Sequence, residues 1–144
     1  MFSKACEYAI RATIYIARQS MEGLRASLAD ISREIDSPIA FTSKILQQLV
    51  KAEIIYSTRG QTGGFYIESA MMESITIAGI VTAIDGDAIY TDCGLGLKEC
   101  SGAEPCPVHE KFAEIRESLK NVLESTNIAS LASGLKNGVT CLKR

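Results

Sequence analysis

The sequence has no apolar run approaching the ~20 residues needed to cross a bilayer. The apolar segment near its start is interrupted by Arg11 and Arg18 and has no region resembling a signal-peptide cleavage site. We therefore expect no membrane span and no secretory signal, and we place the chain in the cytoplasm. The length of 144 residues and the apolar fraction of 47% suit one compact domain, or a small domain with an extension.

Residues for catalysis are scarce as well. The chain has a single histidine, His109, and it lacks a C-x-x-C motif and an evident acid–base pair. Thiol oxidoreductases depend on such groups, so this class is disfavoured. The glycine-rich segment from Arg59 to Gly64 lacks the Lys-Ser/Thr ending and the following helix of a nucleotide phosphate loop. We expect a protein that is not an enzyme.

The chain also lacks the strong positive charge that is typical of nucleic-acid-binding domains, with a net charge of −2 and a pI of about 5.5. The charge is nevertheless uneven. Residues 1–67 carry eight Lys/Arg and six Asp/Glu, a charge of +2, whereas residues 68–144 carry seven and eleven, a charge of −4. This asymmetry suits a DNA-binding front half joined to a back half with another role.

Cysteine is the residue type that stands out. Three of the five cysteines and the only histidine lie in a C-x6-C-x5-C-x2-H pattern, formed by Cys93, Cys100, Cys106 and His109. In the reducing cytosol, clustered cysteines are more often metal ligands or reactive groups than disulfides. Three thiolates and one imidazole complete the ligand set of an iron–sulfur cluster or of zinc, and the spacing does not separate the two. Cys6 is interpreted as a core residue and Cys141 as a bystander.

The first 70 residues read as a helical pair followed by a hairpin. Helices are predicted from Ser3 to Ser20, from Ser27 and from Pro38 to Ala52. A buried stripe of the third helix leaves an uncharged or basic polar side exposed, which makes the last two helices a helix-turn-helix candidate. That exposed side comprises Ala40, Phe41, Ser43, Lys44, Gln47 and Gln48.

Two short apolar strands, residues 54–58 and 65–67, flank the glycine-rich turn and predict a β-hairpin. A hairpin after two such helices is the arrangement of a winged helix. Its tip presents Arg59 on a backbone with little side-chain bulk, which suits a narrow DNA minor groove. The fold class predicted is therefore mainly α with a small β-hairpin wing, the winged domain occupying residues 1–70.

The remainder is predicted to hold a connecting helix and turn (residues 71–92), a cysteine-rich loop (93–109), a long helix and a short one (107–135), and a loose tail (136–144). Pro107 is expected to begin the long helix, with Cys106 as its N-cap, where the helix dipole would lower the thiol pKa. Asp85-Gly86-Asp87 is interpreted as a solvated turn. Apolar residues then recur in a heptad-like seam that predicts pairing of two chains, although packing within one chain would give the same spacing. The seam residues are Val108, Phe112, Ile115, Leu119 and Val122.

Three segments and the cysteine loop together resemble the bacterial IscR/NsrR-type regulators over nearly the whole chain. The segments are Tyr8-Ala9-Ile10-Arg11-Ala12, Leu28-Ala29-Asp30-Ile31-Ser32 and Arg59-Gly60-x-x-Gly63-Gly64-Phe65. The resemblance implies a winged-helix homodimer that binds double-stranded DNA at a palindromic operator. It also implies that the cysteine pattern of the IscR branch holds a 2Fe–2S cluster. The residues it places on DNA are Phe41, Thr42, Ser43, Lys44, Arg59 and Gly60, and the predicted DNA-binding set also includes Ala40, Gly63 and Gly64.

This sequence departs from the IscR pattern at four places. The first cysteine gap holds six residues where five are expected, Gln61-Thr62 replaces proline or glycine in the wing, and Ser43 stands where a glutamate can occur. Ala52-Glu53 replaces the usual glycine after the recognition helix. The functional prediction is a homodimeric transcription regulator controlled by an iron–sulfur cluster. The alternative is a winged-helix regulator whose Cys3His site binds structural zinc or acts as a redox thiol.

Overall fold

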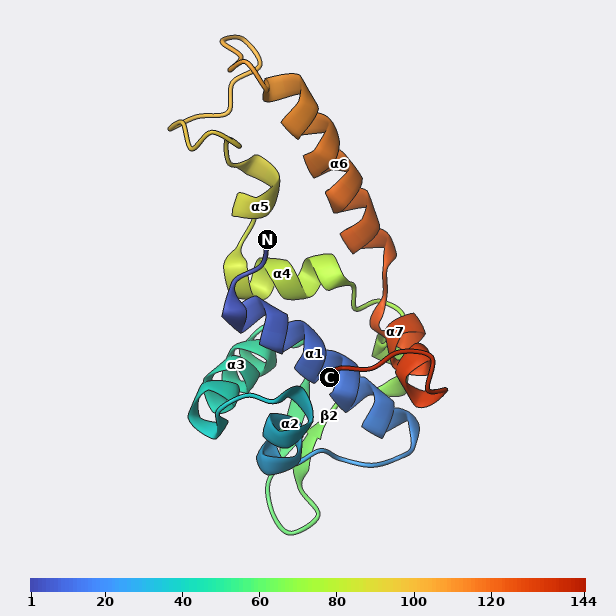
Figure 1. Ribbon diagram of the computed structural model, residues 1–144. Helices are drawn as coiled ribbons and strands as arrows, with labels where there is room; N and C mark the ends of the chain where they lie inside the picture. Colours follow the sequence, from blue (N-terminus) through green and yellow to red (C-terminus); the bar gives the residue numbers. More distant parts are fainter.

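The computed structural model describes residues 1–144 as a helical body from which one long helix and a loop extend (Figure 1). The helices are α1 (Lys4–Met21), α2 (Leu28–Ile35), α3 (Ile39–Lys51), α4 (Ile77–Asp85), α5 (Ala88–Thr91), α6 (His109–Ser125) and α7 (Ile128–Lys136), with a 3-10 turn, η1, at Ser69–Met71. The strands are β1 (Tyr56–Thr58) and β2 (Gly64–Tyr66). This mainly helical fold with one hairpin confirms the predicted fold class.

Side-chain caps set most helix starts, as the sequence predicts for α1 and α2. Ser3 accepts a hydrogen bond from the backbone N–H of Cys6, and Ser27 accepts one from that of Asp30. Thr76 and Asn127 cap α4 and α7 in the same way. Each bond satisfies an N–H group that the helix itself leaves free.

The core lies around α1, which packs against α2, α3, α4 and α7. Cys6 and Ile16 of α1 are completely buried, and so are Leu49 of α3, Ile80 of α4 and Ile128 of α7. Of α6, only Leu123 is buried, so most of this helix lies outside the body, as Figure 1 shows. One core therefore joins the winged half to α4 and α7, and the cysteine loop is carried on the extension.

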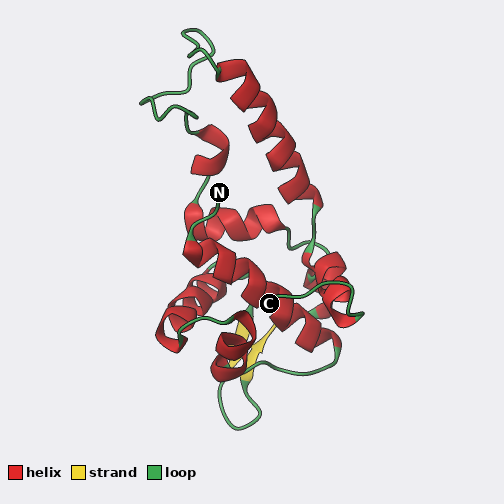
Figure 2. Ribbon diagram, in the orientation of Figure 1, coloured by secondary structure: helices red, strands yellow, loops and turns green.

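The hairpin is shorter than predicted. β1 and β2 pair antiparallel with Tyr56 opposite Tyr66 and Thr58 opposite Gly64 (Figure 2). Ile54 and Ile55, expected in the first strand, are instead buried in the turn after α3. That turn needs a left-handed residue, and Glu53 supplies it with φ 59°.

Several boundaries beyond the hairpin differ from the predictions. Helix α6 begins at His109 with Val108 as its N-cap, so Cys106 is not the cap, and the helix-dipole argument for its thiol is wrong. Asp85 is not merely a solvated turn residue, because its carboxylate accepts hydrogen bonds from the backbone N–H and the hydroxyl of Ser3. Elements α5 and η1 were not predicted, since each spans a single short turn.

The tail after Gly138 is also more structured than expected. The N–H groups of Val139 and Thr140 donate to the carbonyl of Gly134. Leu142 packs against the core, and the Lys143 ammonium donates to the carbonyl of Arg33, 3.3 Å away at the end of α2. The tail, which has no helix or strand, is therefore attached to the body at Leu142 and Lys143.

Candidate nucleic-acid interface and metal centre

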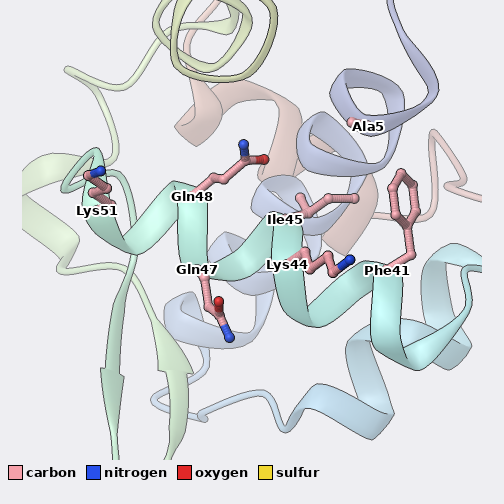
Figure 3. A pocket seen from close by; sticks show the side chains of 7 residues that line it. All are labelled: Ala5, Phe41, Lys44, Ile45, Gln47, Gln48 and Lys51. Carbon is pink, nitrogen blue, oxygen red and sulfur yellow. The ribbon is translucent and has the colours of Figure 1, made fainter.

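The outer side of α3 carries basic and neutral polar groups and no acid. Lys44, Gln47, Gln48 and Lys51 are exposed there. They line a shallow groove of about 540 Å³, which Ala5 of α1 and Phe41 and Ile45 of α3 complete. Figure 3 shows these side chains along α3, with the Phe41 ring turned toward α1. Long side chains with free donors on one helix face are suited to base edges and phosphates in a major groove.

Phe41 packs against α1. Its ring meets that of Tyr8 edge to face, with centroids 5.7 Å apart, and the Arg11 guanidinium lies 4.7 Å from the Tyr8 centroid. Arg11 also donates to the carbonyl of Ile35 at 2.9 Å, at the end of α2. Phe41 is consequently half-buried and fixed at the edge of the exposed face.

Thr42 has to be removed from the predicted DNA-binding set. Its side chain is fully buried, and its hydroxyl hydrogen bonds to Ser37 and to the carbonyl of Pro38, each at 3.0 Å. At 100° per residue it lies on the inner side of α3, whereas Ala40 and Lys44 lie on the outer side. The hydroxyl locks the turn between α2 and α3, and it cannot reach a DNA duplex.

The wing depends on its glycines. Gly60 and Gly64 have φ of 102° and 143°, in the region that other residues avoid. A Cβ on Gly63 would overlap the Thr58 carbonyl. Arg59 is exposed at the tip, and neither of the two ion pairs in the molecule involves it.

The loop that holds the candidate ligands, residues 93–109, lies at the far end of the extension and leads into α6 (Figure 1). The Cys100 Sγ lies 3.5 Å from the His109 Nδ1. The Arg116 guanidinium, two turns further along α6, donates to the Cys100 Sγ at 3.2 Å and to the carbonyl of Asp92 at 3.3 Å. All five cysteines are free thiols.

The pKa of the Cys93 thiol is lowered from its ordinary value. Hydrogen bonds from the backbone N–H groups of Leu95 and Leu97 are the main cause, and burial opposes them. The Cys106 side chain and the positive charge of Arg116 lower this pKa further. The loop therefore favours a thiolate at Cys93, which is the form that binds metals and reacts with oxidants.

Of the predicted ligands, the structure brings the Cys100 thiol against the His109 ring. No three of them form a group arranged to hold an ion in this structure. Their soft donor set nevertheless fits an iron–sulfur cluster or zinc. Gly94 rests on the Phe112 ring, since a Cβ there would lie 2.5 Å from it, so the loop already packs on α6.

The apolar seam of α6 is largely uncovered within one chain. Phe112, Ile115 and Val122 are 38%, 61% and 59% exposed, whereas Leu119 packs against the core. A row of large apolar side chains on one helix face is what helix pairing between chains requires.

The fold and its exposed basic helix define a class of protein, the winged-helix DNA-binding regulators. Residues 2–134 match the family model Rrf2, described as "Iron-dependent Transcriptional regulator", and the chain belongs to this family. It is a DNA-binding transcriptional regulator, because the family model and the relatives are described as transcriptional regulators, the relatives of the HTH type.

Two curated relatives are named "HTH-type transcriptional regulator IscR". The protein of Erwinia tasmaniensis is 29% identical over 126 residues, which cover 88% of this chain and 74% of the relative. The protein of Serratia proteamaculans is 28% identical, with 88% and 75% covered. No helix of the present chain has the length and apolar character to cross a membrane.

Solved structures agree on the fold. CymR of B. subtilis, described as "the Global Cysteine Regulator", is 25% identical with a TM-score of 0.75, and the match covers 92% of this chain and 96% of CymR. The IscR of T. potens matches with a TM-score of 0.75 at 18% identity, covering 98% and 92%.

Two residues at these sites are not predicted from the sequence. Arg116 contacts Cys100, 16 residues away. Arg25 contacts the wing from the loop between α1 and α2. No short motif marks either of them, because their partners are distant in sequence.

Proposed function

We propose that this regulator is a homodimer whose binding to a palindromic operator is controlled by an iron–sulfur cluster, with 2Fe–2S favoured. The observation that supports it is the Cys100–His109 pair at the start of α6, the helix that also bears the exposed apolar seam. Because one helix carries both features, occupancy of the cysteine loop can alter how two chains pair. Control of this kind requires an element with two arrangements that both sites influence.

The proposed ligands are Cys93, Cys100, Cys106 and His109. A bound cluster would supply a one-electron redox centre and tie the loop to the helix start. The glycines between the first two cysteines allow that loop to close around it. Arg116 donates hydrogen bonds to Asp92 and to Cys100, which are the two ends of the loop segment 92–100.

On DNA, two copies of α3 would enter successive major grooves, about 34–36 Å apart. A small change in the angle at the α6 pair would alter that separation, which makes affinity sensitive to the cysteine site. The proposed contacts from α3 are Ala40, Phe41, Ser43 and Lys44, with Arg59, Gly60, Gly63 and Gly64 from the wing.

The test is an anaerobic purification followed by iron, sulfide and zinc assays, absorption spectra, and DNA binding before and after chelation. Red-brown protein containing iron and sulfide, with a different DNA affinity after chelation, is the expected result. Colourless protein with one zinc per chain would support the structural-zinc alternative. Equal affinity of loaded and emptied protein for every duplex would overturn cluster control.

A matched pair of variants locates the site. Cys100→Ala should abolish cluster loading while leaving the fold and the dimer unchanged. Cys141→Ala removes an exposed cysteine outside the loop and should load normally. If Cys100→Ala dissociates the dimer without any metal present, the loop has a structural role and not a sensory one.

A second candidate is control through the thiols themselves. It is favoured by the lowered pKa of Cys93 and by the likeness to CymR, which is described as a cysteine regulator. Metal-free protein would be treated with hydrogen peroxide and examined by mass spectrometry and DNA binding. Oxidation of loop cysteines that changes affinity reversibly supports this candidate, and unchanged affinity contradicts it.

A further inference from the structure

The loop between α1 and α2 pairs with strand β2 of the wing through a single residue, Ala26. The Ala26 N–H donates to the Phe65 carbonyl at 3.0 Å, and the Phe65 N–H donates to the Ala26 carbonyl at 2.8 Å. Ala26 is completely buried there. The backbone of Gly64 also lies directly against this loop, because a Cβ on Gly64 would lie 2.8 Å from the Ala26 oxygen. The base of the wing therefore rests on this loop.

Arg25, next in the same loop, contacts both strands of the wing. Its guanidinium lies 4.6 Å from the centroid of the Tyr66 ring on β2, and it donates a hydrogen bond to the Thr58 hydroxyl on β1. The Tyr66 ring in turn lies 5.9 Å from that of Tyr56, its partner across the hairpin. A planar guanidinium can stack flat on a ring while the N–H groups at its edge donate hydrogen bonds, whereas a compact ammonium has no plane to stack.

Such a clamp has a mechanical consequence. Each strand has three residues, and an isolated two-stranded hairpin is marginally stable in water. The tip, where Arg59 lies, makes no contribution to the core. The direction in which the tip points is therefore set by the contacts at its base. From outside the hairpin these come from Arg25 and Ala26 and from α1, against which β2 packs and whose Ser20 hydroxyl accepts a hydrogen bond from the Ile67 N–H.

We propose that Arg25 is a positioning residue for the wing: it clamps Thr58 to Tyr66, holds the tip in one orientation and thereby delivers Arg59 to the DNA minor groove. This rests on the proposed role of the wing in DNA binding. Arg25 acts through Arg59 and not as a separate phosphate contact.

The first test needs no DNA. Amide hydrogen exchange is measured at Phe65 and along the two strands. Arg25→Ala should speed exchange about fivefold to tenfold, the combined loss of a cation–π contact and one hydrogen bond. Arg25→Lys should resemble Arg25→Ala, because it keeps the charge but loses the planar stack. Arg59→Ala, which touches neither strand partner, is the control and should exchange like wild type. Unchanged exchange in Arg25→Ala overturns the clamp.

The ring partner provides a second, matched pair. Tyr66→Phe keeps the aromatic face and should leave exchange unchanged, whereas Tyr66→Leu should reproduce the effect of Arg25→Ala. Equal behaviour of the two variants would show that the ring face is not what holds Arg25.

The last test is a double-mutant cycle for affinity to a duplex selected in vitro from a randomised pool with the wild-type protein. Arg25→Ala should weaken binding about fivefold to tenfold when Arg59 is present, and should have no further effect in Arg59→Ala. Additive losses would overturn the positioning role in favour of a direct contact. If Arg59→Ala alone leaves affinity unchanged, the wing assignment fails, while the exchange experiment still decides whether the clamp exists.

Discussion

At the scale of single residues, Arg116 links the cysteine loop to α6. Its guanidinium donates to the thiol of Cys100, one of the proposed ligands, and to the backbone carbonyl of Asp92, which precedes Cys93. Groups that orient metal ligands from outside the ligand set usually change affinity when they are removed. Arg116 would therefore orient the proposed ligands without binding the cofactor itself.

We expect Arg116→Gln to weaken binding of Zn²⁺ to the metal-free protein about 10- to 100-fold, in line with other residues that support metal ligands. Competition with a chromophoric chelator measures this affinity. Lys120→Gln, one turn further along α6, removes a cation that touches none of the cysteines and is the control. Equal affinities of the two variants would contradict a placing role for Arg116.

Cys6 shows the opposite environment. Burial, and then the negative charge of Asp85, raise the pKa of its thiol to about 12. The raised pKa stabilises the folded state fully below the ordinary thiol pKa near 9, and this contribution is lost as the pH rises from there toward 12. Between these values, the free energy of unfolding should therefore fall more steeply in wild type than in Cys6→Ala.

Alkylation provides a direct check on Cys6. Native protein treated with iodoacetamide at pH 8 should be modified at Cys141 and not at Cys6, as read by peptide mass spectrometry. Rapid modification of Cys6 in folded protein would contradict its burial.

At the scale of elements, the turn after α3 stores strain. Glu53 adopts φ 59°, a backbone conformation that costs a residue with a Cβ about 1–2 kcal/mol. A glycine would avoid this cost, but the greater entropy of its unfolded chain would offset about 0.5–1 kcal/mol of the stabilisation. Glu53→Gly should therefore raise the free energy of unfolding by about 0.5–1 kcal/mol. Thermal denaturation measures it, and Glu53→Ala, which keeps the strain but removes the charge, should show no comparable gain.

At the scale of the whole molecule, the exposed seam of α6 predicts a dimer. Ile115 is 61% exposed, so Ile115→Lys should not disturb the fold of one chain. In a dimer it would place two charges in an apolar interface, and sedimentation should then show monomers. Glu117→Lys, which lies about 200° around α6 from Ile115 and is also exposed, is the matched control. A variant that remains dimeric would place the interface elsewhere.

Dimerisation and DNA binding should be lost together in Ile115→Lys. A dimer presents two copies of α3 and of the wing, and the phosphates that they neutralise set the dependence of affinity on salt. The monomeric variant should therefore bind the selected duplex more weakly and with a shallower salt dependence. An unchanged salt slope would mean that one copy makes all the contacts.

Local signals in the sequence determined most of the helices, the hairpin and the fold class. Ser3 and Ser27 cap helices because a hydroxyl can reach an N–H group three residues ahead, wherever the helix later packs. The glycines of the wing are required by backbone angles that a neighbouring turn dictates. The spacing of the cysteines and of the apolar residues of the α6 seam is likewise visible in the sequence, because it does not depend on contacts between distant segments.

Tertiary structure alone decided what depends on contacts between distant segments. Thr42 faces inward because the turn after α2 brings Ser37 against it, Asp85 meets Ser3 across 82 residues, and Arg25 reaches β1 across 33. The start of α6 at His109, and the pairing of Cys100 with it, likewise follow from how the loop settles on the helix. Caps and turns are governed by interactions within a few residues, whereas these contacts appear only once packing has fixed the relative positions of whole elements.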